Sequence, residues 1–594
     1  MLDVRVYRAA FLPALVALFV AAFSLADRPA PLSSPLSADS FRGDRAFGGR
    51  APLRNSLTEL GRAYPNRSPG SADDAALSDR VADTLGAADR TGRPAFEVTR
   101  ERAGEIETVI GVRPGLSSRQ IVVVSHRDAV GRPGLAELSG TAGMLELARL
   151  FRARDLRRTL VLVSTSGATL GATGARAWAE GLDERSVDAV LVLGDLAGKR
   201  VAKPWVAPWS LATGPAPLAL ERTVEQALRA EEAGPPGGSR ASAQWARRAL
   251  PFTVSEQGVI AAAGLPAVMI SASGERGPAA GDAVTAARLE RFGRSVLRTV
   301  TAIDAAPGGE AFGSSPAGLV TMRNVLPDWA VRLLVGTLLL PAFLTALDGF
   351  FRVRRRGLAV GPWFAWLAAV GLPVLLAWAW VRALGLTSAL DVPDAPVLPL
   401  QALERSGVLA LASVALVLAL GWFGIRPLIL ARAGRRGSPA AGSLAGAMGA
   451  VLCVLAAIVW AANPYAAALL LPATHLWLFA SAPQTRLSGW AGVAAVVIGL
   501  LPFALLAVAY GQALALNPLE LAWMTLLGAA SGQLSVAAAF VAATVLACAV
   551  AVVVIMRTRR RAAADVGPEP LRTRGPVTYA GPGSLGGTES ALRR

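Results

Sequence analysis

The chain has 594 residues, of which 53% are hydrophobic and only 17% are charged, and its mean hydropathy is +0.45. An ordinary soluble domain carries roughly 25% charged residues, so we expect much of this chain to lie in lipid; a disordered, collagen-like or disulfide-stabilised chain is excluded. The net charge of +17 comes almost entirely from Arg. Because no basic patch is interleaved with aromatic residues, we assign this charge to membrane topology and expect no nucleic-acid partner.

The first apolar segment, residues 9–26, is long enough to span a bilayer. Two arginines precede it, which predicts a cytoplasmic N-terminus and an uncleaved transmembrane anchor over residues 1–26. The alternative is a signal peptide, because residues 24–26 (Ser-Leu-Ala) resemble a small-residue cleavage site. In both cases we expect the chain that follows to be exported.

Composition divides the rest of the chain. Residues 27–55 are rich in Pro, Ser, Gly and Arg and predict a linker, residues 56–306 predict one globular domain, and residues 307–328 predict a second linker. Residues 329–556 are mainly apolar, and residues 557–594 form a basic tail that we expect to be disordered and cytoplasmic. Seven spans are expected in the apolar region, at residues 329–347, 358–381, 407–425, 441–462, 464–481, 489–510 and 534–556.

The basic residues of this region alternate between its loops. Arginines follow the first, third, fifth and last of these segments, at residues 352–356, 426–436, 486 and 557–561. Alternation of this kind is what positive-inside sorting produces, and it predicts a multi-pass cell-membrane protein with residues 27–328 outside. Residues 512–530 are apolar but contain Glu520, and a further span there would place the basic tail outside. We therefore expect an interfacial or re-entrant helix at this position.

Strand-length apolar runs alternate with helix-period segments in the globular domain. Strands are expected at 106–112, 120–125, 158–165, 187–194 and 266–271, and helices at 72–87, 139–153, 172–181, 217–231, 256–263 and 285–304. This order predicts an α/β domain with a mostly parallel sheet and helices on both faces. Ligands of such sheets bind beyond the carboxyl ends of the strands, which here carry residues 125–128 (Ser-His-Arg-Asp) and Asp195.

Six segments of this domain, in this order, carry a resemblance to a known family. They are residues 66–71 (NRSPGS), 121–128 (IVVVSHRD), 133–151, 158–180, 190–198 and 255–271. Together they resemble the zinc-dependent aminopeptidases of the aminopeptidase-Y and bacterial aminopeptidase-S type. The resemblance implies a zinc-exopeptidase fold and a pair of zinc ions that activate a water molecule, with a glutamate as the general base.

Three residues match positions that the resemblance assigns to the metal site. In the family, a His-x-Asp strand end and an Asp after a later strand contribute to zinc binding. His126 and Asp128 match the first motif, and Asp195 matches the later Asp. The resemblance thus implies that His126 and Asp195 are candidate metal ligands. Asp128 is expected to support these ligands without binding the metal itself.

The remaining family positions have changed. The Asp that bridges the two zinc ions corresponds to Ala136, with Glu137 beside it. The general base corresponds to Ala168 and the neighbouring ligand to Thr169, and the family's final His has no counterpart. The resemblance therefore implies a scaffold that has lost its general base and most of its zinc ligands, and we assign no catalytic residue.

The chemistry of the remaining donors leaves two interpretations. Zinc needs three or four nitrogen, sulfur or carboxylate ligands, and His126, Glu137 and Asp195 can supply only a mononuclear site. The other interpretation has no cofactor: Asp128 and Asp195 then cap loops, and Ser139 caps the helix that starts there.

Polar residues are scarce in the expected spans. His475 lies within the fifth span and Asn463 directly precedes it. Two roles are left open for His475: a hydrogen bond between helices, or part of a proton relay. The expected layout is one N-terminal span, an exported aminopeptidase-like domain and seven further spans. This layout resembles that of the Gaa-type subunit of the GPI transamidase. It also resembles that of membrane-bound vacuolar and endoplasmic-reticulum relatives of the peptidase. The Gaa-type resemblance implies a non-proteolytic role in handling a peptide and a lipid anchor.

The leading hypothesis is a polytopic membrane protein whose exported aminopeptidase-like domain is catalytically inactive. It would bind or position a polypeptide, a membrane protein or a lipid-linked partner. One alternative is a membrane-bound zinc peptidase that uses His126, Asp195 and a shifted carboxylate. The other is a transporter with an accessory outer domain, whose flux would depend on His475.

Overall fold

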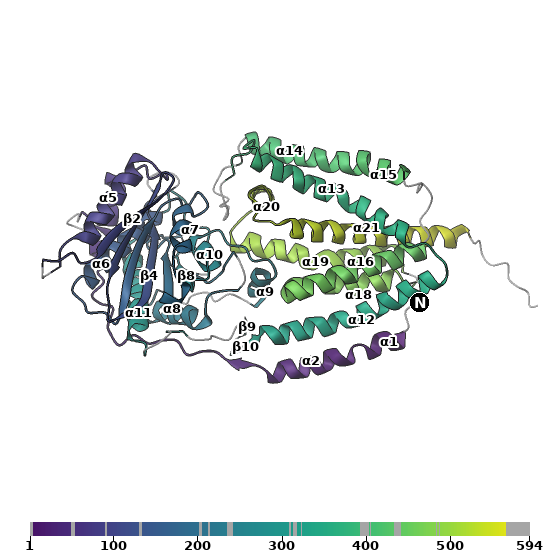
Figure 1. Cartoon of the computed structure of the whole chain (residues 1–594), viewed down its shortest axis with the longest axis horizontal. Helices are drawn as coiled ribbons and strands as arrows, with labels where there is room; N and C mark the ends of the chain where they lie inside the picture. The colour runs from purple at the N-terminus through teal and green to yellow at the C-terminus, as the bar shows by residue number, and fades with distance from the viewer. Residues whose placement is uncertain are drawn as a thin grey trace, which may run out of the picture.

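The computed structural model describes two regions that lie end to end along the longest axis of the molecule (Figure 1). One is an α/β domain and the other is a helical bundle. The described residues are 4–48, 54–89, 92–129, 134–200, 205–211, 214–233, 241–307, 311–312, 318–321, 323–392, 403, 405–432, 441–482, 484–485 and 487–565. Most of the predicted disordered tail, from residue 566 onward, lies outside them.

A seven-stranded sheet forms the centre of the α/β domain, in the order β2-β3-β5-β4-β6-β8-β7. Its strands are β2 (Glu97–Ala103), β3 (Ile106–Arg113), β4 (Ser117–His126), β5 (Arg158–Thr165), β6 (Val187–Leu193), β7 (Val206–Ala207) and β8 (Ala267–Ile270). The prediction of an α/β fold is confirmed. The parallel part comprises the four central strands, β5, β4, β6 and β8.

The outer strands make the sheet mixed. β3 runs antiparallel to β5, β2 to β3, and β7 to β8. β2 and β3 are joined by only two residues, and Gly104 has a positive φ of 63°, so they form a tight hairpin whose strands must be antiparallel. The sequence pattern did not predict β2, because this edge strand (EVTRERA) is largely polar and exposed.

Helices cover both faces of the sheet, as the sequence predicted. One face packs against α5 (Ala72–Gly86), α6 (Leu135–Phe151), α8 (Leu218–Ala230) and α11 (Ala286–Ala305), and the other against α7 (Thr173–Glu180) and α10 (Glu256–Ala262). Successive residues of β4 serve the two cores: Ile121 and Val123 enter one, and Val122 and Val124 the other. A strand buried on both faces is apolar throughout, which explains its uninterrupted apolar sequence.

The described part of the predicted linker 27–55 packs on the domain. Phe41 is fully buried in the larger core, beside Gly293 of α11. The short helix α3 (Gly43–Phe47) follows it and also contacts α11. Composition predicts a linker here, and Phe41, Ala38 and Ala46 of this segment are buried in the core of the α/β domain.

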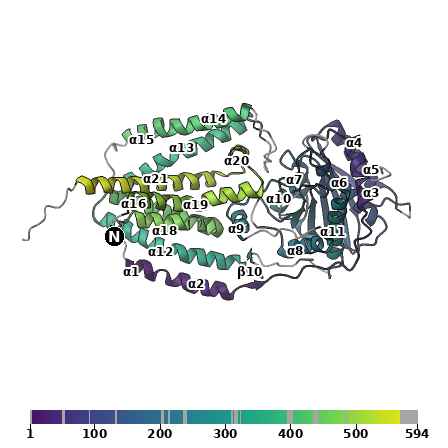
Figure 2. The same cartoon turned by 180° about the vertical axis from the view of Figure 1, so that it is seen from behind.

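The predicted linker 307–328 also contains structure. Two short strands, β9 (Gly318–Val320) and β10 (Asn324–Pro327), form a small antiparallel sheet with β1 (Ala26–Asp27). This sheet joins the end of the first apolar segment to the start of the bundle. α1 (Val4–Ala9) and α2 (Leu12–Phe23) therefore run beside the first long bundle helix, α12 (Asp328–Arg355), in Figures 1 and 2.

The bundle contains six helices that are long and apolar enough to cross a membrane, among the residues described. They are α12, α13 (Gly361–Leu386), the helix Arg405–Ala431 (labelled α14, Arg405–Ala419, and α15, Arg426–Arg432, around a π-helical turn), α16 (Ala441–Ala462), α19 (Gly489–Ala513) and α21 (Val536–Asp565). The segment expected at 464–481 is shorter and is divided into α17 (Pro464–Ala468) and α18 (Leu471–Ala480). Residues 518–531 form α20 (Pro518–Ser531), a separate 14-residue helix.

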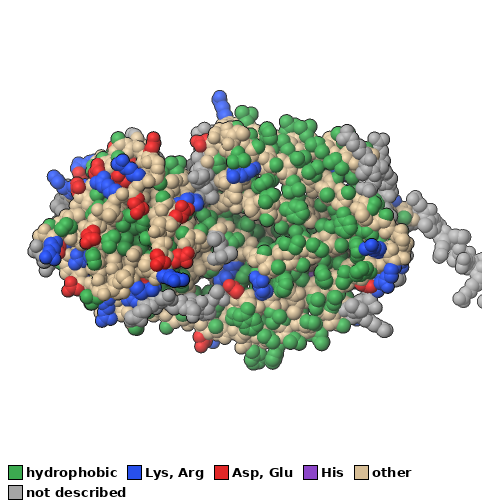
Figure 3. All heavy atoms as spheres, in the orientation of Figure 1, with side chains coloured by type: hydrophobic (Ala, Val, Ile, Leu, Met, Phe, Trp, Pro, Cys, Tyr) green, Lys and Arg blue, Asp and Glu red, His purple; other side chains and the backbone are tan. Residues whose placement is uncertain are grey.

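The surface of the molecule follows this division. In Figure 3, hydrophobic side chains cover much of the bundle, whereas charged side chains gather over the α/β domain and at the far end of the bundle. A membrane environment for the bundle accounts for this distribution, because apolar side chains are stable against lipid.

α9 (Ala241–Ala249) and the residues after it connect the two regions. The helix packs against α17 and α19. Its Trp245 Nε1 donates to the Tyr465 carbonyl at 3.1 Å, and Asn463 Nδ2 donates to the Arg248 carbonyl at 2.8 Å. The Tyr510 hydroxyl of α19 donates to the Leu250 carbonyl. These bonds fix the α/β domain on one end of the bundle.

Candidate functional site

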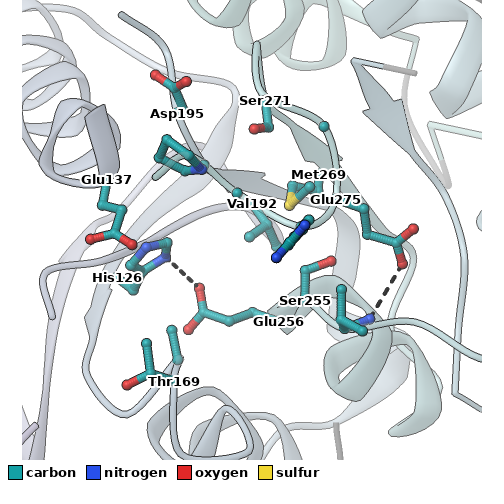
Figure 4. Close-up of a pocket in the computed structure, with 17 residues that line it drawn as sticks. His126, Glu137, Thr169, Val192, Asp195, Ser255, Glu256, Met269, Ser271 and Glu275 are labelled. Carbon is teal, nitrogen blue, oxygen red and sulfur yellow. Dashed lines mark hydrogen bonds and ion pairs between the residues drawn. The ribbon is translucent and has the colours of Figure 1, made fainter. Parts of the chain in front are cut away.

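A small pocket lies at the carboxyl edge of the parallel strands, where the sequence predicted a site. His126 ends β4, Asp195 follows β6, Glu137 is in the first turn of α6, and Glu256 begins α10. The pocket has a volume of about 60 Å³. Figure 4 shows the side chains that line it. The lining residues are His126, Glu137, Ala168, Thr169, Val192, Gly194, Asp195, Val254, Ser255, Glu256, Met269, Ser271, Gly274, Glu275, Arg276, Gly277 and Pro278.

His126 is held by a carboxylate that the sequence analysis did not single out. Its Nδ1 lies 3.3 Å from Oε2 of Glu256, and Oε1 of Glu256 accepts a 2.6 Å hydrogen bond from the Thr165 hydroxyl. Burial alone would lower the pKa of His126, but the hydrogen bond and charge of Glu256, with the charges of Asp128 and Glu137, raise that pKa to about 9. The imidazole is therefore a cation at neutral pH.

Glu137 lies beside His126 in the same pocket (Figure 4). Burial is the main cause that raises the pKa of Glu137 to about 7, while the positive charges of His126 and Arg67 oppose the shift. Arg67 is fully buried, and its guanidinium donates to the carbonyls of Arg127 and Gly134 at 3.1 and 2.9 Å. Oε2 of Glu137 is buried and accepts no hydrogen bond from the described part of the chain.

Asp195 is used to hold its own loop. Its Oδ1 accepts hydrogen bonds from the backbone N–H groups of Ala197 at 2.9 Å and Gly198 at 2.6 Å. Burial raises the pKa of Asp195, and these backbone hydrogen bonds partly offset the shift. Its carboxylate points away from His126 in Figure 4. The strand-end carboxylate that the sequence gave as a metal candidate is thus not directed at the same point as His126.

Asp128 likewise caps a loop. Its two carboxylate oxygens accept hydrogen bonds from the backbone N–H groups of Ala168 and Thr169, each at 3.3 Å, and Thr169 Oγ1 adds a third at 3.2 Å. Between His126 and Asp128, the Arg127 side chain turns away and pairs with Asp74 at 2.8 Å. Ala168, which the resemblance matches with the family's general base, has only a methyl side chain, and its backbone N–H donates to Asp128.

The predicted capping role of Ser139 is wrong. α6 begins four residues earlier, at Leu135, after Gly134 in the left-handed conformation. Ser139 is therefore inside the helix, where its hydroxyl donates to the Ala136 carbonyl at 2.5 Å and accepts from the Leu196 N–H at 2.8 Å. The serine ties α6 to the Asp195 loop instead of capping a terminus.

His475 and Asn463, the two polar residues singled out from the sequence of the bundle, both make hydrogen bonds between segments. His475 Nδ1 lies 2.8 Å from the Tyr7 hydroxyl, and its Nε2 lies 3.0 Å from the Leu338 carbonyl. Asn463 caps α17 through the N–H groups of Tyr465 and Ala466 while it donates to the Arg248 carbonyl. Neither residue lies in the pocket.

Residues 108–274 match Peptidase family M28. No curated protein matches the chain. Among solved structures, a Zn-dependent exopeptidase from Parabacteroides distasonis is 17% identical over 45% of this chain and 99% of its own, with a TM-score of 0.34. The LapA aminopeptidase of Legionella pneumophila is 14% identical over 45% and 73%, with a TM-score of 0.36. A glutaminyl cyclase from an Acidobacteriales bacterium is 18% identical over 47% and 99%, with a TM-score of 0.34.

Part of the α/β region is thus similar to Peptidase family M28, and this region is joined to a bundle in which the described residues form six long apolar helices. M28 proteins usually bind zinc, so we compared the positions of the His, Cys, Asp and Glu side chains with the needs of a zinc site. Within the described ranges, no three His, Cys, Asp or Glu side chains are placed to hold one metal ion. His126 pairs with Glu256, and Asp195 binds backbone amides. This arrangement does not fit the family's zinc pair, and we derive no step through zinc.

Two residues of the site were missed from the sequence. Glu256 lies in segment 255–271, which carries part of the family resemblance. An acidic residue in the first turn of a helix is ordinarily explained by its favourable interaction with the helix dipole, so it was not singled out. Arg67 lies in segment 66–71, and nothing in the local sequence pattern predicts that its guanidinium is buried under the pocket. In both cases the partner is distant in sequence: Glu256 is 130 residues from His126, and Gly134 is 67 from Arg67.

Proposed function

We propose that this is a polytopic membrane protein whose M28-like domain binds the amino-terminal end of a polypeptide without hydrolysing it. The observation that carries the proposal is the lack of catalytic groups at the positions where the resemblance expects them. Ala168 offers no base, and Oδ1 of Asp195 accepts hydrogen bonds from backbone N–H groups while the carboxylate points away from His126. Hydrolysis of an amide needs an activated water and a group that takes its proton, and these residues supply neither.

The charges that line the pocket favour a cationic ligand group. Among the described lining residues, Glu137, Asp195, Glu256 and Glu275 are acidic and His126 and Arg276 are basic, while the charge of the buried Arg67 also acts on Glu137. Glu256 is neutralised by His126, and Glu275 is paired with Arg247 behind the wall. Glu137 remains without a hydrogen-bond partner among the described residues, and it is the acceptor we assign to the ligand.

The size of the pocket restricts what enters it. A volume of about 60 Å³ accommodates a primary amine and its first carbon atoms but not a folded surface. A buried, unpartnered carboxylate gains most from a donor that is itself charged. An N-terminal ammonium meets both requirements, and an acetylated N-terminus meets neither.

Binding of a peptide by the full-length protein in nanodiscs tests the proposal. We expect a peptide with a free N-terminus to bind and its N-acetylated form to bind at least tenfold more weakly. Glu137→Gln should remove most of this preference, whereas Glu101→Gln, on the exposed β2 strand, should leave it unchanged. Equal binding of the two peptides, or hydrolysis of the free one, would overturn the proposal.

A zinc hydrolase with an altered metal site is the second candidate, and one observation favours it. Nδ1 of His126 faces Glu256, an arrangement that also orients metal-binding histidines, and it leaves Nε2 without an assigned role. Glu137 Oε2 lies in the same pocket. This candidate predicts bound zinc and peptide hydrolysis, both lost in His126→Ala.

The orientation of the protein is part of the proposal. The alternation of arginine-rich loops supports a location of residues 27–328 outside the cell membrane, with the basic tail inside. Proteolysis of intact cells from outside should cleave the α/β domain and spare a tag placed at the C-terminus. Protection of the domain in intact cells would contradict this orientation.

A further inference from the structure

One wall of the pocket is held by the bundle. Residues 274–278 line the pocket, and Arg276 in this wall donates to the Ala515 carbonyl at 2.9 Å. Its guanidinium also lies 3.8 Å from Glu520 in the first turn of α20. The pocket therefore borders directly on the segment that connects α19 to α20.

A second set of contacts fixes the same wall from behind. Glu275 pairs with Arg247 of α9 and accepts a hydrogen bond from the Thr253 hydroxyl. The Arg247 guanidinium lies over the ring of Tyr510 in α19, 4.9 Å from the ring centroid. On the other side, Gln533 Nε2 donates to the Thr253 carbonyl. The wall is thus held between the α/β domain and the bundle, through α19 and the loop that precedes α21.

The partly exposed lining residues show where the pocket opens. Most of the lining is buried, but six lining residues are partly accessible: His126, Ala168, Thr169, Ser255, Arg276 and Gly277. Among these residues, Arg276 contacts the α19–α20 connection. The mouth is therefore bordered on one side by residues 515–520 of the bundle, where Leu519 is 58% exposed.

This side of the mouth lies at the membrane surface. α19 ends at Ala513 and α21 begins at Val536, and both are long enough to span a bilayer. The chain between two adjacent spans must emerge at one surface, and here it emerges on the side of the α/β domain (Figure 1). The charged rim formed by Arg276 and Glu520 is then at the level of the lipid headgroups.

From these contacts we infer that the α19–α20 connection completes the mouth of the pocket, and that its ligand is the free amino-terminal end of a membrane-anchored polypeptide. The inference rests on the proposed function and specifies the class of ligand. A chain that leaves the bilayer beside α20 presents its end to Arg276 and Glu520 over a short distance. Anchoring also raises the effective concentration of that end at the mouth, which strengthens binding without a new contact.

A spacer series tests the inference with the full-length protein in phosphatidylcholine nanodiscs. The probe is one peptide with a free N-terminus, used unanchored or joined at its C-terminus to an acyl chain through a short or a long Gly-Ser spacer. We expect the short-spacer peptide to bind at least tenfold more tightly than the unanchored one and more tightly than the long-spacer one. If only the long spacer permits binding, or if anchoring has no effect, the mouth is not at the membrane surface. If no peptide binds in any form, the proposed function itself fails.

Selective blocking of the mouth gives a second, independent readout. The only two cysteines of the chain are buried, so a cysteine introduced at an exposed position can be labelled selectively. A bulky maleimide on Leu519→Cys should weaken binding of the anchored peptide at least tenfold. The matched control is Leu116→Cys, which is 90% exposed just before β4, at the end of that strand opposite His126. Equal binding by the labelled variants would overturn the inference.

Discussion

Nδ1 of His126 lies 3.3 Å from Oε2 of Glu256, which joins the end of β4 to the start of α10 across the candidate site. Glu256 is buried and His126 is largely so, and the Thr165 hydroxyl donates to the second oxygen of the carboxylate. His126 therefore behaves as one half of an internal ion pair at neutral pH.

The first prediction concerns the protonation of this pair. The chain has two histidines, so isotope labelling of histidine gives two imidazole signals, and His475 provides an internal reference. His126 should titrate near pH 9, and Glu256→Gln should lower its pKa by more than one unit because the hydrogen bond and charge are removed. A pKa for His126 near its ordinary value in the wild-type protein would contradict the ion pair.

The same pair has a defined effect on stability. Because the folded-state pKa of His126 is above the unfolded-state value, the contribution of its protonation to stability is complete below about pH 6.5 and is lost as the pH rises through about 9. Glu256→Gln should therefore lower the thermal unfolding temperature more at pH 6 than at pH 10. An equal loss at both pH values would assign the effect to packing alone.

Glu137 gives the second prediction. Its folded-state pKa of about 7 exceeds the ordinary value of 4.5, so the folded protein binds the proton more tightly and loses stability as the pH rises from 4.5 through 7. Glu137→Gln does not titrate, and it should stabilise the protein above pH 7 by roughly 1–3 kcal/mol while changing little near pH 4.5. Unfolding temperatures measured across this range, with Glu101→Gln as the exposed control, check the prediction. A constant difference across the pH range would contradict it.

Much of the α/β architecture follows from local sequence, because burial on both faces makes a strand apolar throughout and helices of the other layers keep their 3.6-residue period. All five strands expected from the sequence are present, from β3 to β8. β2 was not predicted because an exposed edge strand does not need apolar residues. Phe41 made a segment of linker composition part of the core, and no local pattern reveals such a contact.

The site was less predictable for a related reason. His126 and Asp195 were found at strand ends and Glu137 through the family resemblance, but which of these side chains face one another depends on their direction. Asp195 turns to the N–H groups of its own loop, and Glu256 approaches His126 from another layer. Contacts between residues so far apart in sequence have no signature in the spacing of a single chain.

The third prediction tests the packing that positions the Asp195 loop. A Cβ atom on Gly140 would lie 2.6 Å from the Leu193 carbonyl oxygen and 2.7 Å from that of Gly194, both backbone atoms that have little room to move. Gly140→Ala should therefore destabilise the protein by about 1–3 kcal/mol, because α6 must shift away from the end of β6. Gly281→Ala faces open space and is the matched control. Equal unfolding temperatures for the two variants would show that the contact is not as close as described.

The fourth prediction concerns a buried ion pair at the opposite edge of the sheet. Asp188 accepts hydrogen bonds from Arg158 Nε at 2.5 Å and Arg119 Nε at 2.6 Å. Asp188→Asn leaves the buried Arg158 without its counter-charge and should destabilise the protein by roughly 3–5 kcal/mol. Asp79→Asn removes an exposed pair with Arg100 and should change stability by less than about 1 kcal/mol. Chemical denaturation in detergent distinguishes the two, and similar losses would contradict the buried pairing.

The metal content of the purified full-length protein tests the central claim most directly. The protein is loaded with zinc, dialysed and analysed by mass spectrometry of the metal, alongside His126→Ala. If the site has lost its hydrolytic function, zinc should remain well below one ion per chain, and the variant should retain the same amount. Near-stoichiometric zinc that disappears in His126→Ala, together with peptide hydrolysis by the wild-type protein, would contradict the claim.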